Sequence, residues 1–170
     1  NRATANYATI GGGGKSDPML LDTANRVTDE YGTVGGGGDN QAGDGDASTT
    51  NSTYATVGGG LSNTAGSITA SVGGGAYNVA SDLRATVGGG AYNTASDDSS
   101  TVGGGYGNTA SAVSATVSGG QDSAAGGDYS TVGGGYSNTA GGAYTTIAGG
   151  DVNQVTDNYG AVGGGEGNLA

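Results

Sequence analysis

The segment 38–46 gathers the side chains best suited to hold a metal ion. It contains Asp39, Asp44 and Asp46, together with Asn40 and several glycines. Carboxylate and amide oxygens are the ligands that Ca²⁺ prefers in proteins. The spacing follows neither the EF-hand loop nor the glycine-aspartate calcium roll, so we expect a weak calcium site here and no other cofactor. The simpler interpretation is that these carboxylates are solvated charges that keep the protein soluble.

Other kinds of chemistry are largely excluded by composition. The chain has no His and no Cys, so nucleophile–base pairs could come only from Lys15 or the carboxylates, and we expect no enzyme. Gly14-Lys15-Ser16 lacks the spacing of a phosphate-binding loop. The net charge of −11 disfavours nucleic acid and anionic lipid as partners. No apolar run is long enough for membrane insertion.

Two further residue types recur in columns that could form a binding surface. A threonine precedes most of the β-branched residues that introduce the glycine runs, and a tyrosine stands two residues before several of those threonines. The threonines are Thr9, Thr33, Thr56, Thr86, Thr101, Thr116, Thr131 and Thr146. The tyrosines are Tyr7, Tyr31, Tyr54, Tyr129, Tyr144 and Tyr159. Stacked tyrosines are most simply a stiffening ladder, or else a contact stripe for sugar, protein or a second subunit.

These columns exist because the sequence repeats every 15 residues. The β-branched anchors run without a break in that spacing from Val57 to Val162. Two earlier anchors, Ile10 and Val34, are followed by longer intervals that imply insertions near 14–24 and 38–47. An asparagine stands nine residues before each anchor, with Ser48 and Ser123 as the exceptions. A strict repeat of this kind predicts a repetitive fold despite a composition that alone would suggest disorder.

A 15-residue unit is too short for a helical repeat, which needs 33 residues or more. It suits one coil of an all-β parallel β-solenoid, with two short strands per coil, such as 85–88 and 93–96. Alternation along a strand then places Val87 inside and Thr86 outside. We therefore expect a single domain over 1–170, with about ten coils and two side insertions.

The repeat resembles a known family. The segment 130–140, Ser-Thr-Val-Gly-Gly-Gly-Tyr-Ser-Asn-Thr-Ala, is similar to the head repeats of trimeric autotransporter adhesins of the YadA type and to repeats of phage tail-fibre-like proteins. The resemblance implies a left-handed parallel β-roll, a homotrimer and a role in surface adhesion. The repeat is one residue longer than is usual in that family, and no part of residues 1–170 resembles the family's neck and anchor segments.

The sequence thus predicts an extracellular structural or adhesive fibre protein without catalytic activity. Both ends fall at the same phase of the repeat, so we expect a segment of a longer fibre. The expected partners are further copies, end to end or as a homotrimer, and a cell-surface or matrix ligand. The alternative function is ice binding, because the outward threonine row also resembles the faces of ice-binding β-rolls.

Overall fold

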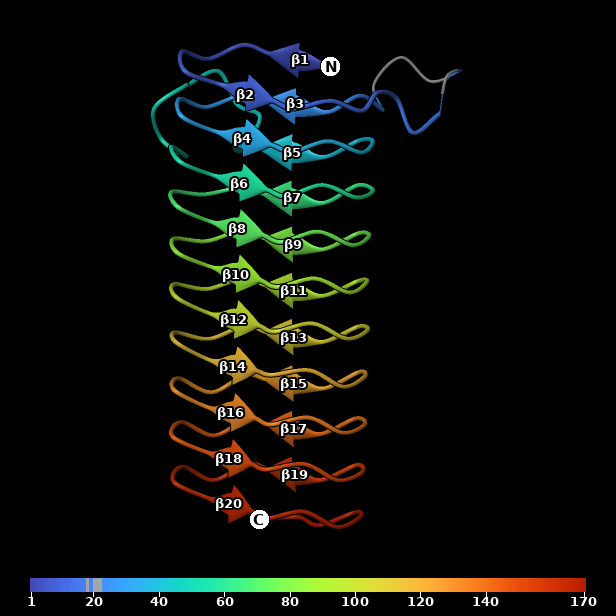
Figure 1. Ribbon diagram of the computed structural model, residues 1–170. Coiled ribbons are helices and arrows are strands. Elements are labelled where there is room, and N and C mark those ends of the chain that lie inside the picture. The colour runs from blue at the N-terminus through green and yellow to red at the C-terminus, as the bar shows by residue number, and fades with distance from the viewer. Residues whose placement is uncertain (18, 20–22) are drawn as a thin grey trace.

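The chain winds into a straight stack of nearly identical coils (Figure 1). The computed structural model describes residues 1–17, 19 and 23–170. Within these residues, twenty strands of two residues each alternate between two ten-stranded sheets. The described residues contain no helix. This confirms the all-β parallel β-solenoid with two short strands per coil.

The odd-numbered strands form one sheet and the even-numbered strands form the other. The first sheet contains β1 (Arg2–Ala3), β3 (Arg26–Val27), β5 (Gln41–Ala42), β7 (Thr64–Ala65), β9 (Val79–Ala80), β11 (Thr94–Ala95), β13 (Thr109–Ala110), β15 (Ala124–Ala125), β17 (Thr139–Ala140) and β19 (Gln154–Val155). The second contains β2 (Thr9–Ile10), β4 (Thr33–Val34), β6 (Thr56–Val57), β8 (Ser71–Val72), β10 (Thr86–Val87), β12 (Thr101–Val102), β14 (Thr116–Val117), β16 (Thr131–Val132), β18 (Thr146–Ile147) and β20 (Ala161–Val162).

Every pairing is parallel and joins equivalent positions of successive coils. Thr86 pairs with Thr101, and Val87 pairs with Val102. The core is therefore a set of one-residue columns that run along the stack. The anchor valines from β4 to β16 and Ile147 in β18 are almost completely buried, and they form one core with the alanines at the ends of β5 to β17. Alternation explains the pattern, since only the second residue of each strand points inward.

A ladder of asparagine side chains runs beside this core. In Asn93, the side-chain amide donates to Asn78 Oδ1 at 3.1 Å and to the carbonyl oxygens of Gly89 and Gly105 at 2.9 and 3.0 Å. Its backbone N–H donates to the same Asn78 oxygen. The buried amide is thereby satisfied by its own coil and both neighbours, as an interior polar group requires.

The ladder is possible because the third glycine of each run leaves room for it. At Gly105, φ is +94°, and an added Cβ would lie 2.1 Å from the carbonyl oxygen of Gly120 and 2.7 Å from Asn108 Nδ2. No side chain fits at those separations. This explains why the third position of the run is glycine in all ten copies.

The second insertion does not lie where the repeat arithmetic placed it. β5 begins directly after Asn40, whose side-chain amide donates to Asn25 Oδ1 and whose own Oδ1 accepts from Asn63. The ladder position of this coil is thus held by Asn40 and not by Ser48. The additional residues follow Ala42, within 43–51, instead of preceding it within 38–47. The first insertion follows Gly14, which still pairs with Gly38, and precedes Asn25.

Candidate binding surfaces

The threonine column lies on the outer surface of the even-numbered strands. The first residue of each of these strands forms what we call the threonine face: Thr9, Thr33, Thr56, Ser71, Thr86, Thr101, Thr116, Thr131, Thr146 and Ala161. All are partly or fully exposed, whereas the β-branched residues that follow them in β4 to β18 are buried. The structure therefore places all eight predicted threonines in one row, as the alternation indicated.

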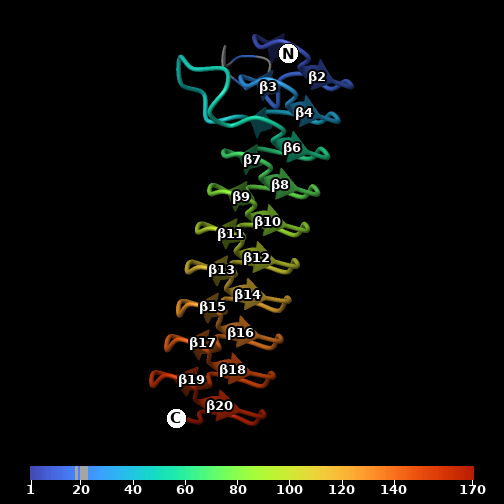
Figure 2. The same ribbon diagram turned by 90° about the vertical axis from the view of Figure 1, so that its left-hand side faces the viewer.

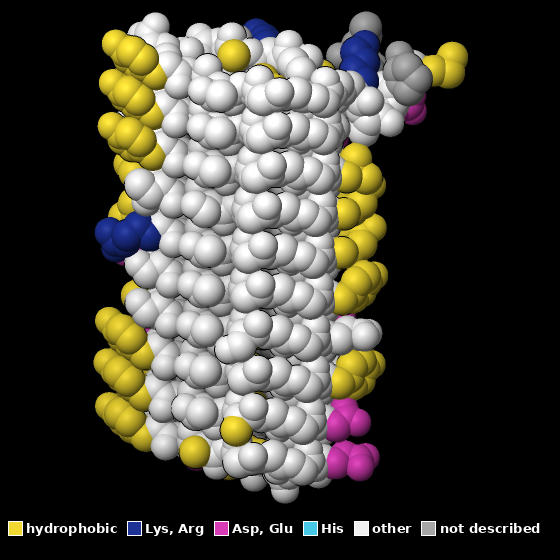
Figure 3. Space-filling model, viewed as in Figure 1, with side chains coloured by type: hydrophobic (Ala, Val, Ile, Leu, Met, Phe, Trp, Pro, Cys, Tyr) yellow, Lys and Arg dark blue, Asp and Glu magenta, His cyan; other side chains and the backbone are white. Residues whose placement is uncertain are grey.

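The threonine face is flat and carries no charge. Figure 3 shows it in front, with charged side chains only at its margins. Most of the residues that follow these strands are glycines, so no larger side chain rises beside the threonine row. Strands in a sheet lie about 4.8 Å apart, so the face presents one regular rank of hydroxyl and methyl groups. It offers no carboxylate or amine for acid–base chemistry.

The predicted tyrosines form two separate stacks along one edge of the solenoid. Tyr7, Tyr31 and Tyr54 stack with ring centroids 4.8 Å apart. The second stack contains Tyr129, Tyr144 and Tyr159, with centroids 5.0 and 5.2 Å apart. All six are exposed. Because the middle ring of each stack is covered on both faces, only the rings at the ends, such as Tyr7 and Tyr159, keep a face without an aromatic neighbour.

The backbone at these tyrosines turns through the left-handed region. Tyr31 and Tyr54 have φ values of 59° and 62°. Their N–H groups donate to the carbonyl oxygens of Asn6 and Glu30 on the preceding coils. This conformation is costly for a residue with a side chain, and the bond to the preceding coil together with ring stacking offsets the cost.

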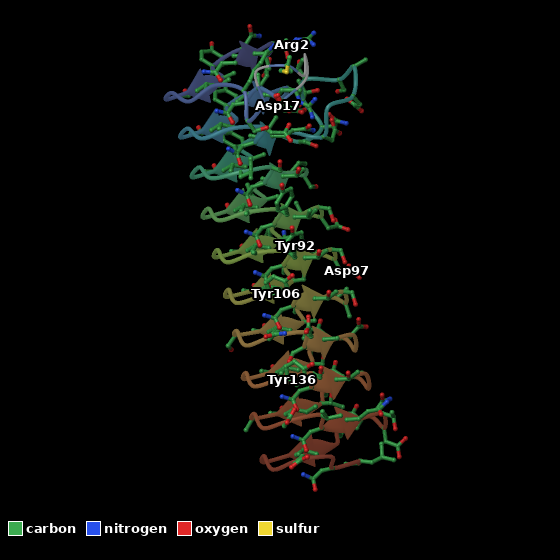
Figure 4. All side chains as sticks on the ribbon, turned by 90° about the vertical axis from the view of Figure 1, so that its right-hand side faces the viewer. Arg2, Asp17, Tyr92, Asp97, Tyr106 and Tyr136 are labelled. Carbon is green, nitrogen blue, oxygen red and sulfur yellow. The ribbon has the colours of Figure 1, made fainter. Side chains whose placement is uncertain are left out.

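A further aromatic group occupies the opposite edge. Tyr77 stacks on Tyr92 with centroids 4.9 Å apart, and Tyr92 meets Tyr106 edge to face at 5.4 Å. Figure 4 labels Tyr92, Tyr106 and Tyr136 along this edge. The aromatic contacts are thus divided between the two edges of the solenoid, and the threonine face lies between them (Figure 3).

The three aspartates predicted to hold calcium do not converge. Asp44 and Asp46 lie together because Asn51 Nδ2 donates to both carboxylates, at 2.8 and 2.9 Å. Asp39 lies before the start of β5, whereas Asp44 and Asp46 follow the end of that strand. Asp39 accepts a hydrogen bond from the Ser62 hydroxyl. Among the described residues, no group of three acidic, His or Cys side chains could hold a metal ion.

A groove beside these aspartates was not anticipated from the sequence. The second insertion leaves the stack on the side of the odd-numbered strands and stands beside the first coils (Figure 2). Between the loop and the outer surface of β1, β3 and β5 is a groove of about 550 Å³. Its lining includes Arg2, Arg26, Gln41, Asp44 and Asp46.

A buried carboxylate holds the loop against the stack. Asp29 is fully buried. It accepts hydrogen bonds from the Ser52 N–H and the Thr28 hydroxyl, both at 3.1 Å. The Thr28 oxygen in turn accepts from the N–H of Gly45. These contacts fix both ends of the loop, so the groove has a defined wall. The only sequence signal for them is a cluster of polar residues in the insertion.

Comparison with known proteins adds no family assignment. No protein-family model and no curated protein matches the sequence. Among the described residues, no helix is long and apolar enough to span a membrane.

Proposed function

We propose that this chain is a rigid structural and adhesive element of an extracellular fibre, without catalytic activity, of the kind found in YadA-type adhesin heads or tail-fibre-like proteins. The observation that carries the proposal is the continuous stack itself. Each coil pairs in register with the next through both sheets, and the interior is filled by columns of Val, Ala and Asn side chains. A filled interior of this kind leaves binding to the outer surfaces, as in a rigid rod that presents contact surfaces to other molecules.

The threonine face is the surface best suited to contact another copy. A chain with a net charge of −11 repels its own copies where carboxylates approach each other. The threonine face is uncharged over its whole length, so copies can meet there without bringing carboxylates together. Side-by-side association through this face, as a homotrimer or a bundle, is therefore the proposed assembly, and the exposed edges remain available to a cell-surface or matrix ligand.

Sedimentation velocity together with electron microscopy tests the assembly. We expect association that grows with concentration and that is abolished by the double variant Thr101→Glu, Thr131→Glu, which places charge on the threonine face. The matched control Ser114→Glu, Ser137→Glu adds the same charge at the two edges and should still associate. A wild-type chain that stays monomeric at high concentration, or equal loss in both variants, contradicts the proposal.

Ice binding is the second candidate, and the flat threonine face is the observation that favours it. A regular rank of hydroxyl and methyl groups at about 4.8 Å can order water in a repeating pattern. The same two double variants separate the candidates. If the wild-type chain is a monomer that shapes ice crystals and lowers the freezing point, and if the threonine-face variant alone loses that effect, ice binding replaces the fibre.

A further inference from the structure

The fibre proposal assigns no chemical role to the two stacks of three tyrosines. Their six rings project from one edge of the solenoid, with exposed fractions from 41% for Tyr31 to 76% for Tyr159. Within the described residues, none of the six hydroxyl groups forms a hydrogen bond. Each phenol is therefore open to an oxidant in the solvent.

Within each stack the fold holds neighbouring rings face to face. The ring planes of Tyr7 and Tyr31 differ by 4°, as do those of Tyr144 and Tyr159. Backbone hydrogen bonds from Tyr31, Tyr144 and Tyr159 to the preceding coils fix this spacing. A tyrosyl radical carries unpaired electron density at its two Cε atoms, and exposed side chains rotate on the nanosecond timescale or faster. Two radicals in neighbouring coils are thus held where they can react as an intramolecular pair.

The rest of the chain offers few competing sites for one-electron oxidation. It contains no Trp and no Cys, the side chains that otherwise take over a radical from tyrosine. Its single methionine, Met19, takes up an oxygen atom from peroxide and becomes a sulfoxide. A radical formed on this chain therefore stays on tyrosine until it meets a second one.

We propose that the two tyrosine stacks are sites of oxidative cross-linking, at which hydrogen peroxide and a peroxidase couple neighbouring rings into dityrosine. Each tyrosine of a pair loses one electron and one proton from its hydroxyl group. The two radicals join through a carbon–carbon bond between Cε atoms, and the hydrogen on each joined carbon moves to the oxygen and restores the phenol. The two electrons and two protons reduce one peroxide molecule to two water molecules.

The product is a covalent bond between successive coils. A bond between Tyr7 and Tyr31 closes a loop of the chain, as a disulfide does, and so lowers the entropy of the unfolded state. The cross-links therefore stabilise the stack against unfolding. This inference goes beyond the fibre proposal and does not depend on it, because each coupling joins two coils of the same chain.

Treatment of the dilute protein with a haem peroxidase and hydrogen peroxide tests the site. We expect dityrosine fluorescence and a higher melting temperature than that of the untreated protein. After digestion with trypsin, we expect a cross-link between the peptides 3–15 and 27–84, because the first contains Tyr7 and the second contains Tyr31.

The double variant Tyr31→Phe, Tyr144→Phe keeps every ring but removes the middle hydroxyl of each stack. Of the parallel tyrosine pairs in the described residues, Tyr77 and Tyr92 then remain, so the dityrosine yield should fall about threefold. The matched control Tyr106→Phe, Tyr136→Phe removes two phenols outside the parallel stacks (Figure 4), and it should couple like the wild type.

Three results would overturn the proposal: no dityrosine, equal loss of yield in both double variants, or cross-links that join only separate chains. A melting temperature that is unchanged after coupling would overturn the stabilising role. Sedimentation of the untreated chain decides the fibre proposal separately, since neither double variant alters the threonine face.

Discussion

At the scale of single residues, two buried serines differ in whether their hydroxyl groups have hydrogen-bond partners. Ser100 and Ser130 occupy the same inward column, where five other coils have alanine and the rest have Gly32, Thr145 and Gly160. The Ser100 hydroxyl donates to the carbonyl oxygen of Asp97 at 2.7 Å. In the described part of the chain, Ser130 Oγ is the one buried side-chain polar atom without a hydrogen-bond partner.

The contrast predicts opposite effects of one substitution. Ser130→Ala removes an unsatisfied buried hydroxyl and should stabilise the fold by about 1 kcal/mol. Ser100→Ala removes a made hydrogen bond and should destabilise it by about the same amount. Thermal unfolding of both variants checks the order, and a lower melting temperature for Ser130→Ala than for Ser100→Ala would contradict it.

The glycines of a run also differ in how well their positions tolerate a side chain. Gly105→Ala places a Cβ against the backbone of the next coil in a left-handed conformation, so we expect a loss of about 3 kcal/mol. Gly89 belongs to the second position of a run, where an added Cβ meets only the Gly74 oxygen, at 4.0 Å. Gly89→Ala should therefore be nearly neutral. Equal melting temperatures for the two variants would show that the short distance between Gly105 and the Gly120 carbonyl oxygen does not exclude a side chain at the third position.

At the scale of elements, the asparagine ladder is a single structure that is interrupted once. Ser123 takes the ladder position between Asn108 and Asn138. Its N–H still donates to Asn108 Oδ1, and its hydroxyl accepts from the Asn138 N–H at 3.2 Å. The shorter side chain makes no bond to the carbonyl groups of Gly119 or Gly135, the equivalents of those that Asn93 reaches.

Restoring the ladder should strengthen the stack. In Ser123→Asn the new amide can donate to the Gly119 and Gly135 carbonyl oxygens, and we expect a gain of about 1 kcal/mol. The reverse change, Asn93→Ser, breaks a continuous part of the ladder and should cost at least as much. Urea unfolding measures both free energies, and destabilisation by Ser123→Asn would mean that this coil has no space for the amide.

At the scale of the whole molecule, each coil contacts its neighbours through one repeated interface. In such repeat proteins, stability is approximately a sum over units and their nearest-neighbour contacts. Removal of one complete unit should therefore preserve the fold, provided that every column stays in register.

Deleting residues 103–117 joins Val102 to Ser118 and removes one 15-residue unit. We expect the same β-rich circular dichroism spectrum and a rod shorter by about 5 Å in X-ray scattering. Deleting 103–118 removes one residue more, so the anchor column and the third-glycine column cannot both stay aligned with the preceding coil. The second deletion should melt at a lower temperature than the first, and the opposite order would refute the additive description.

Much of this molecule is determined by its sequence, because its order is local and repeated. The 15-residue spacing of the anchors from Val57 to Val162 gives the length of a coil. The alternation of Thr86 and Val87 shows which side chains point outward and which point inward. The same positions then recur in every coil, so one correct assignment carries through the stack. The threonine row and the tyrosine stacks followed from that spacing alone.

The tertiary structure decided what the repeat does not encode. Counting back from Val57 assigns Ser48 to the ladder position of this coil, and only the bonds that Asn40 makes to Asn25 and Asn63 show that Asn40 takes that position. Because the insertion follows β5, this strand lies between Asp39 and the pair Asp44 and Asp46. The same placement brings the loop beside Arg2 and Arg26. The physical reason is that an insertion has no periodicity of its own, so its place depends on which hydrogen bonds and buried groups, such as Asp29, the neighbouring coils supply.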